Sequence, residues 1–196
     1  MSDFNPRPIP RLLLCLSLLM AAVSAQADWT LVNESSQLNF VSTKASHIAE
    51  THTFTELSGQ ITDDGAAKLV IDLTSVDTGI DIRDQRMQSM LFDVVSFPDA
   101  RIETRLDLSA LETLTAPTTL VIEAELSLAG QTTPVQGRVL VVPVDRSRVS
   151  ITTVAPIIVR APSLGLESGI EALREIAGLP SIGYSVPVTF SLIFTR

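Results

Sequence analysis

The chain has 196 residues, a formal net charge of −8 and a single cysteine. The acidic balance argues against nucleic acid as a partner, because phosphate contacts need clustered basic residues. No basic cluster suits an anionic membrane surface either. Since one cysteine cannot form a disulfide within the chain, a hydrophobic core must carry the stability.

Residues 1–27 have the layout of a secretory signal peptide. The basic residues Arg7 and Arg11 come first, followed by an apolar run at 12–23 and the small-x-small cleavage motif Ala25-Gln26-Ala27. The apolar run is shorter than the roughly 20 residues of a membrane span. We therefore expect one exported domain at 28–196, in the periplasm and without stable membrane insertion, and onward secretion stays open. Cys15 leaves with the leader.

Alternating apolar and polar residues recur along nearly all of residues 28–196, and this period predicts strands with one wet face. Eight candidate strands lie near 37–44, 51–62, 67–74, 101–109, 119–128, 133–142, 148–159 and 182–195. Turn residues at Asp63-Asp64-Gly65 and Ala129-Gly130-Gln131 join neighbouring runs as hairpins. Pro187 favours an edge or bulge position in the last strand.

Two short amphipathic helices are predicted in long connections between strands. The first spans about 80–91, with Asp77-Thr78-Gly79 as its capping segment and Phe97-Pro98 preventing its continuation. The second spans about 166–177, and Gly178 is its stop signal. Because closure hides every strand edge, the predicted fold class is all-β: an extended, antiparallel, eight-stranded barrel with two short helices.

A barrel of this size is either filled by side chains or holds one small ligand. Few aromatic residues and small or medium inward positions favour the second choice, and an apolar cavity suits a lipid chain. The predicted cavity-lining residues are Phe40, Leu69, Ile71, Met87, Met90, Leu91, Leu106, Ile122, Leu126, Gly137, Val139, Ile151, Ala155, Val188 and Phe190. Gly137 indicates room for a ligand, or else a bulge or bend.

Catalytic and metal-binding signals are weak. His47 and His52 are five residues apart, so a continuous strand would point them to opposite faces. No hydrolase, zinc-protease or phosphate-loop motif occurs, and we expect no catalytic residues, metal site or cofactor. The competing hypothesis is an enzyme that uses His52 with Glu50 or Glu56 as acid and base.

The densest charged cluster surrounds the first helix and has two readings. Arg83 and Arg86, together with His52, are possible contacts for a lipid head group. Alternatively, the cluster is a capped surface helix with weak intrahelical ion pairs. In the same way, Met87, Met90 and Leu91 form either a pliable gate over the cavity or ordinary core packing.

Three segments resemble the YceI-like family of periplasmic lipid-binding proteins. They are the strand-helix-Phe-Pro segment at 71–102, the hairpin LSLAGQTTPVQGRVLV at 126–141, and the closing helix and strand from about Ser163 to Phe194. The resemblance implies a lipocalin-like barrel that holds a long amphipathic lipid, isoprenoid or quinone-like, and it brings no catalytic residues. One departure is SHIAETHTFTELSG, where the family often has a Gly-x-Phe approach, so the lipid's identity stays open.

Three functions remain after this comparison. The first is a non-catalytic periplasmic protein that sequesters or carries the lipid, and whether it has a protein partner is left open. The second is an enzyme acting on a lipid or quinone. The third is a filled structural or partner-binding barrel.

Overall fold

A computed structural model describes Met1, residues 28–109 and residues 113–196, so the predicted leader lies outside the described residues except for Met1. The strands are β1 (Trp29–Leu31), β2 (Gln37–Lys44), β3 (Ile48–Phe54), β4 (Leu57–Ile61), β5 (Ala66–Asp72), β6 (Val76–Asp77), β7 (Asp99–Arg105), β8 (Thr118–Leu128), β9 (Gln131–Asp145), β10 (Arg148–Thr153), β11 (Ile157–Arg160) and β12 (Ser185–Thr195). The helical segments are η1 (Asn33–Ser35), η2 (Leu73–Ser75), α1 (Asp81–Arg86), η3 (Met87–Phe92), η4 (Ala161–Leu164) and α3 (Glu167–Ile176).

The sheet closes on itself as an eight-stranded antiparallel barrel, which confirms the predicted fold. Closure comes from β1, which pairs with β4 on one side and with β12 on the other. The remaining neighbours follow the order β4-β5-β7-β8-β9-β10-β12. The β2–β3 hairpin extends this wall beyond the closed ring, because β2 pairs with β12 and β3 with β2.

Two predicted strands are each divided in two. The run at 51–62 is β3 and β4, and the run at 148–159 is β10 and β11. In the second case the chain bends at 154–156 before β11 resumes, and Pro156 cannot donate to a ladder there. The predicted strand at 101–109 also ends early, at Arg105.

Glycine is required at the turn between β4 and β5. Gly65 has a φ of 85°, and a Cβ there would overlap the carbonyl oxygen of Leu106. The β8–β9 hairpin turns through Ala129 and Gly130, with φ values of 49° and 76°. Two residues in the left-handed region match the twist of a two-residue hairpin, so both predicted turns are present.

The first predicted helix is present as α1 followed directly by the π-helical segment η3. Asp93, with a φ of 50°, ends it. The predicted cap at Asp77-Thr78-Gly79 is wrong in detail, since the N-cap is Ile80 and no side chain caps it. Asp84 instead accepts hydrogen bonds from the backbone and hydroxyl of Thr78, so the connection folds back on the helix.

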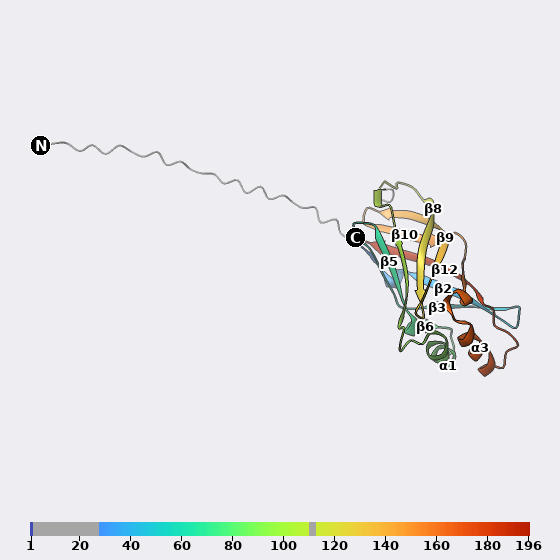
Figure 1. Cartoon of the computed structure of the whole chain (residues 1–196). Helices are drawn as coiled ribbons and strands as arrows, with labels where there is room; N and C mark the ends of the chain where they lie inside the picture. The colour runs from blue at the N-terminus through green and yellow to red at the C-terminus, as the bar shows by residue number, and fades with distance from the viewer. Residues whose placement is uncertain (2–27, 110–112) are drawn as a thin grey trace.

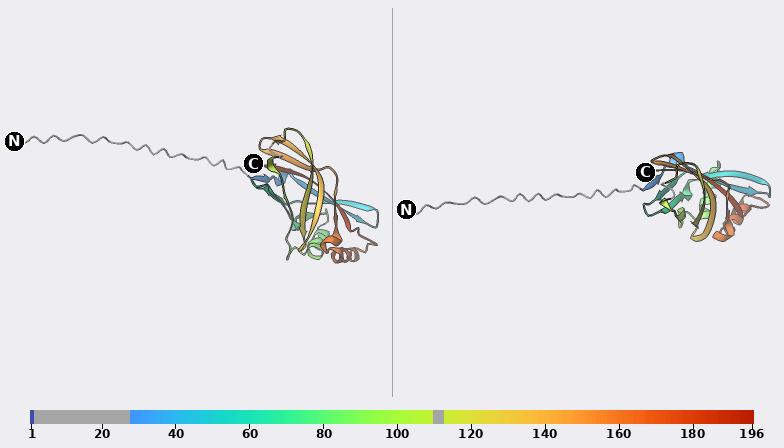
Figure 2. Two further views of the ribbon diagram at one scale, coloured as in Figure 1. Left: turned by 45° about the horizontal axis from the view of Figure 1, so that its top comes forward. Right: turned by 90° about the horizontal axis from the view of Figure 1, so that it is seen from above.

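Both helices lie at one end of the barrel, away from β1 and the C-terminus (Figure 1; Figure 2 shows the same arrangement from two further sides). The second predicted helix is α3, which buries Ile170. At Gly169 an added Cβ would be 2.7 Å from the carbonyl oxygen of Met90 and 2.9 Å from the Cα of Leu91. The absence of a side chain there allows α3 and η3 to touch.

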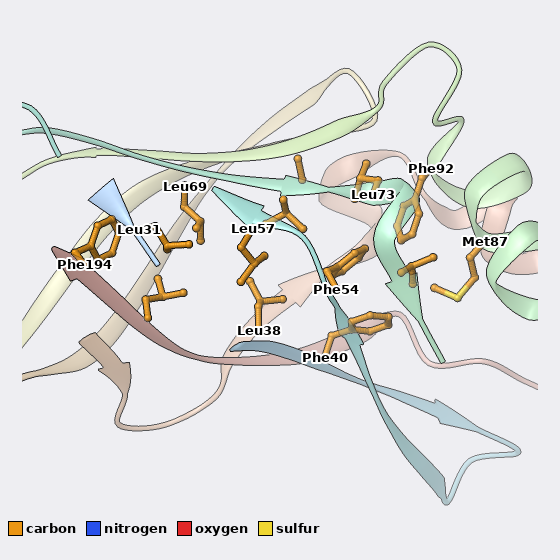
Figure 3. Packing of buried hydrophobic residues seen from close by; sticks show 14 of the residues in the cluster. Leu31, Leu38, Phe40, Phe54, Leu57, Leu69, Leu73, Met87, Phe92 and Phe194 are labelled. Carbon is orange, nitrogen blue, oxygen red and sulfur yellow. The ribbon is translucent and has the colours of Figure 1, made fainter. Parts of the chain in front are cut away.

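Buried side chains run along the length of the barrel. Figure 3 shows them from Leu31 and Phe194 at one end, past Leu57 in the middle, to Phe92 and Met87 beside the helices. At the end away from the helices, Trp29 packs against this core, and the guanidinium of Arg196 lies 4.7 Å from its ring centre. The core is therefore a long row rather than a compact centre.

Candidate functional site

The barrel interior contains three small hollows in series. Their volumes are about 110, 80 and 140 Å³, in order from the Trp29 end toward the helices. The first two share Ile122 and Val139 as walls, and the second and third share Leu126 and Val188. We call the three hollows together the tube.

A fourth hollow, of about 360 Å³, continues the tube toward the helices. It shares Phe40, Met87 and Leu91 with the adjacent hollow of the tube. Unlike the tube, it carries several polar side chains. We call it the mouth, and its polar lining residues are Ser42, Lys44, Glu50, His52, Arg83 and Arg86.

All predicted cavity-lining residues except Met90 and Ala155 lie on the walls of the tube or the mouth. They are Phe40, Leu69, Ile71, Met87, Leu91, Leu106, Ile122, Leu126, Gly137, Val139, Ile151, Val188 and Phe190. For the strand residues the reason is the period-2 alternation across the wall, whereas Met87 and Leu91 lie on the inward side of η3. Whether these residues bind a ligand stays a prediction.

Two of the predicted lining residues are wrong. Met90 is 37% exposed, because η3 turns Met87 and Phe92 inward and leaves Met90 on its outer side. Ala155 is exposed in the bend between β10 and β11, where the strand alternation is interrupted. The gate hypothesis therefore keeps only Met87 and Leu91.

Gly137 faces the interior, as its register opposite Ile122 requires. A Cβ at Gly137 would be 2.6 Å from Cδ1 and 2.9 Å from Cγ1 of Ile157. The glycine thus makes room for the Ile157 side chain of β11. This explains the glycine in a way that differs from the two explanations considered from the sequence, space for a ligand and a bulge or bend.

A bridging carboxylate dominates the mouth. Glu50, on β3, lies 2.8 Å from Nζ of Lys44 on β2 and 2.8 Å from Nη1 of Arg83 on α1. The hydrogen bond from Lys44, supported by Arg83, lowers the pKa of Glu50 below its ordinary value. Glu50 is therefore ionised at neutral pH and ties α1 to the β2–β3 hairpin.

Arg83 uses two further N–H groups within the same connection. Its Nε donates to the hydroxyl of Thr78 at 2.8 Å, and Nη2 donates to the carbonyl oxygen of Thr78 at 2.6 Å. By contrast, the side chain of Arg86 makes no ion pair or hydrogen bond within the described part of the chain. Of the two arginines suggested as head-group contacts, Arg86 has all its side-chain donors available, whereas Arg83 has its Nε, one Nη1 and one Nη2 N–H group paired.

His52 lies between the mouth and the core and is 5% exposed. Its Nε2 is 2.8 Å from the hydroxyl of Ser42, and its ring packs against Phe40 at 5.2 Å between centres. Its Nδ1 is buried and has no hydrogen-bond partner. Burial, followed by the nearby charge of Arg83, lowers the pKa of His52, so the imidazole is neutral at neutral pH.

The acid–base pair suggested by the enzyme hypothesis is not assembled. Glu50 is held by Lys44 and Arg83, and no hydrogen bond joins it to His52. Glu56 is outside the mouth and accepts a hydrogen bond from Asn33. Within 28–109 and 113–196, no three His, Cys, Asp or Glu residues are grouped so that they could hold a metal ion.

Sequence reasoning missed Ser42 and Lys44 at the mouth. The signal was present, because alternation in β2 places them on the same face as Phe40, which was predicted to line the cavity. The pairing of Lys44 with Glu50 needed the hairpin register, in which Ser42 lies opposite Glu50.

Known proteins resemble this chain in sequence and in fold. Residues 29–194 match the YceI-like domain. The chain belongs to the YceI-like family. A polyisoprenoid-binding domain from Saccharophagus degradans, implicated in plant cell wall breakdown, is 37% identical, with a TM-score of 0.82 over 86% of this chain and 98% of that one.

Two more distant structures show the fold alone. BcnA of Burkholderia cenocepacia is 16% identical, with a TM-score of 0.65 over 83% of this YceI-like chain and 98% of BcnA. The YceI protein of Campylobacter jejuni is 11% identical, with a TM-score of 0.55 over 74% and 84% of the two chains. No curated protein matches the chain. In the described parts, no helix has the length and apolar character needed to cross a membrane.

Proposed function

We propose that this YceI-like chain is a non-catalytic binding protein for a long-chain isoprenoid-type lipid. The tail lies in the tube and the head group lies at the mouth. The observation that carries the proposal is the continuity of the apolar hollows with one polar opening. The polyisoprenoid-binding domain at 37% identity supports the same ligand class.

Burial of the tail supplies the affinity. Each methylene group moved from water into an apolar site gains about 0.8 kcal/mol, so even a tail of modest length offsets the cost of association. Apolar walls discriminate poorly between tails, so selection among lipids falls to the mouth. Since His52 is hydrogen-bonded to neither Glu50 nor Glu56, this arrangement favours sequestration or carriage over turnover.

Protein purified from its native host tests the proposal. Native mass spectrometry followed by organic extraction should find a lipid of isoprenoid mass, released only on unfolding. An empty barrel that also fails to take up added isoprenoid would contradict it and favour the filled-barrel alternative. Conversion of the added lipid to a product would favour the enzyme.

We also propose that the protein acts in the periplasm after removal of residues 1–27. The small-x-small motif before Asp28 supports cleavage there. Mass analysis of a periplasmic extract should find a chain that begins at Asp28. An intact leader, or a lipid attached to Cys15, would contradict this location.

A further inference from the structure

The mouth has an unusual charge arrangement for an acidic protein. Three cations line it, Lys44, Arg83 and Arg86, together with the single carboxylate of Glu50. Judged by composition alone, such an opening would attract an anionic head group, such as a phosphate. The pairing of these groups reverses that expectation.

Glu50 already occupies the position that an anionic head group would take. Its two carboxylate oxygens separately contact Lys44 and Arg83, each at 2.8 Å. The other N–H groups of Arg83 that the structure pairs donate to Thr78. An incoming phosphate would have to break these pairs and would then lie beside the Glu50 carboxylate.

We propose that Glu50 is a specificity-determining residue that makes the mouth select isoprenoids with an uncharged polar head group over phosphorylated ones. This inference rests on the proposed function, since it concerns the head of a lipid whose tail lies in the tube. Its physical basis is the penalty for placing like charges together at a partly desolvated site, which specific binding sites use to reject competitors.

His52 gives the uncharged head group a partner. The neutral imidazole has a buried Nδ1 without a hydrogen-bond partner, and Ser42 already holds the other ring nitrogen. A buried polar atom left unpaired is costly, so a hydroxyl or carbonyl group that reaches Nδ1 removes that cost. A head group of the alcohol or quinone class therefore matches the mouth.

Arg86 does not restore a preference for anions. It is the mouth cation that has no partner within the described residues, and it is partly exposed on α1. The field of one exposed cation is screened by salt. A diphosphate head group would leave most of its charge uncompensated there while facing Glu50.

Two probes with the same tail test the inference. Geranylgeraniol and geranylgeranyl diphosphate differ only in the head group, so the ratio of their dissociation constants reports the mouth and cancels the tube. Wild-type protein should bind the alcohol more tightly, by about ten-fold or more. Glu50→Gln frees Lys44 and Arg83, and it should move the ratio toward the diphosphate by about ten-fold.

The matched control is Glu34→Gln, which removes the same charge at an exposed position on η1 outside the mouth. It should leave the ratio unchanged. Glu50→Thr, with a side chain suited to a strand, should reproduce the shift seen with Glu50→Gln. Retained binding of the alcohol shows that each variant is folded with an intact tube.

The outcomes separate this inference from the proposed function. If wild-type protein binds neither probe, the proposed function fails. If it binds both but prefers the diphosphate, or if neither Glu50 variant changes the ratio, the function stands and the role of Glu50 is wrong. Loss of alcohol binding in both Glu50 variants would also overturn it, because Glu50 would then support the fold and not selection.

Discussion

The tube and the mouth are lined by different kinds of side chain, so under the proposed function each would hold a ligand by different physical means. The tube walls are mostly aliphatic and aromatic side chains of the barrel strands, the β2–β3 hairpin and the helical segments, and their attraction is non-directional. At the mouth, charged and hydrogen-bonding groups from β2, β3 and α1 meet at fixed distances. Under the proposed function, affinity would come from the tube and selection from the mouth.

The two regions also differ in how they are held. Most of the tube lies within strand ladders, and Met87, Leu91 and Phe92 of η3 form part of its wall at the end next to the mouth. The mouth depends on the β2–β3 hairpin, whose turn places Ala45 and Ser46 at φ values of 49° and 66°. Non-glycine residues in this region store some strain. Contacts with the segment at 181–183 and with Arg83 hold the hairpin in place, so the mouth is the less redundantly supported region.

The largest effect is expected from blocking the tube at Ala100. This residue is 3% exposed and lines the hollow nearest the mouth. Ala100→Phe places a ring where about four methylene groups of a tail would lie, so the affinity should fall by about 3 kcal/mol, or roughly 100-fold. Titration of the Ala100→Phe variant with geranylgeraniol and with geranylgeranyl diphosphate measures this loss of affinity.

Both probes should weaken by the same factor, since the tube does not sense the head group. Val121→Phe is the control, because Val121 is 60% exposed on the outside of the wall. Unequal weakening of the two probes would contradict the division between tube and mouth. Thermal melting of the lipid-free variant checks that overpacking, which typically costs about 1–3 kcal/mol, has not unfolded it.

The fold and the tube could be predicted because both follow from one local signal. Period-2 alternation fixes which side chains face inward, whatever strand lies next to them. The errors fall where that period is interrupted. Met90 lies in η3, whose π-helical turn shifts the inward face, and Ala155 lies in a bend between strands. The role of Gly137 needed a contact with β11, which no local pattern encodes.

The second prediction concerns that contact. Gly137→Leu should force Ile157 away from β9 and lower the free energy of unfolding by about 1–3 kcal/mol. Ile157→Ala in the same chain should recover part of this loss, because the new side chain then fills the vacated space. A double-mutant cycle by denaturant unfolding measures the coupling. Additive effects would mean that the two residues do not touch.

The mouth was predicted less well than the tube. His52, Arg83 and Arg86 were all suggested as head-group contacts, and all three line the mouth. What the sequence could not give is their pairing, because Glu50 and Arg83 are 33 residues apart and meet only through the barrel and α1. The sequence therefore suggested a receptor for an anion, whereas the structure shows a site in which Glu50 already neutralises Arg83.

The third prediction tests how the mouth is held. Arg83→Met removes the hydrogen bonds to Glu50 and Thr78, and it should cost about 1 kcal/mol at this partly exposed site. Amide hydrogens of α1 should exchange faster, while those of β8 and β9 should not change. Arg86→Met is the matched control, since Arg86 lines the same mouth without a described partner. Equal effects of the two variants would contradict the bridging role of Arg83.

The smallest effect is expected from pH, and it should be confined to the mouth. Burial holds the pKa of His52 below its ordinary 6.5, with Arg83 and Lys44 acting in the same direction and Glu50 and Asp84 opposing it. The unfolded chain therefore binds a proton at His52 before the folded chain does. By linkage, the stability that neutral His52 contributes is present above pH 6.5 and is lost as the pH falls through the lowered value.

Glu50 titrates in a different window, which allows the two groups to be separated. Its pKa lies below the ordinary 4.5, so its contribution is lost only at more acidic pH. Between pH 6.5 and 4.5, His52→Phe should therefore flatten the decline in unfolding free energy seen for the wild type. His47→Gln, at an exposed hairpin position, should keep the decline. Chemical unfolding at several pH values measures the decline in both variants. The affinity of the His52→Phe variant for geranylgeraniol should not vary between pH 6.5 and 4.5, because no side chain of its tube titrates in that range. A decline that persists in His52→Phe would place the sensitive group outside the mouth.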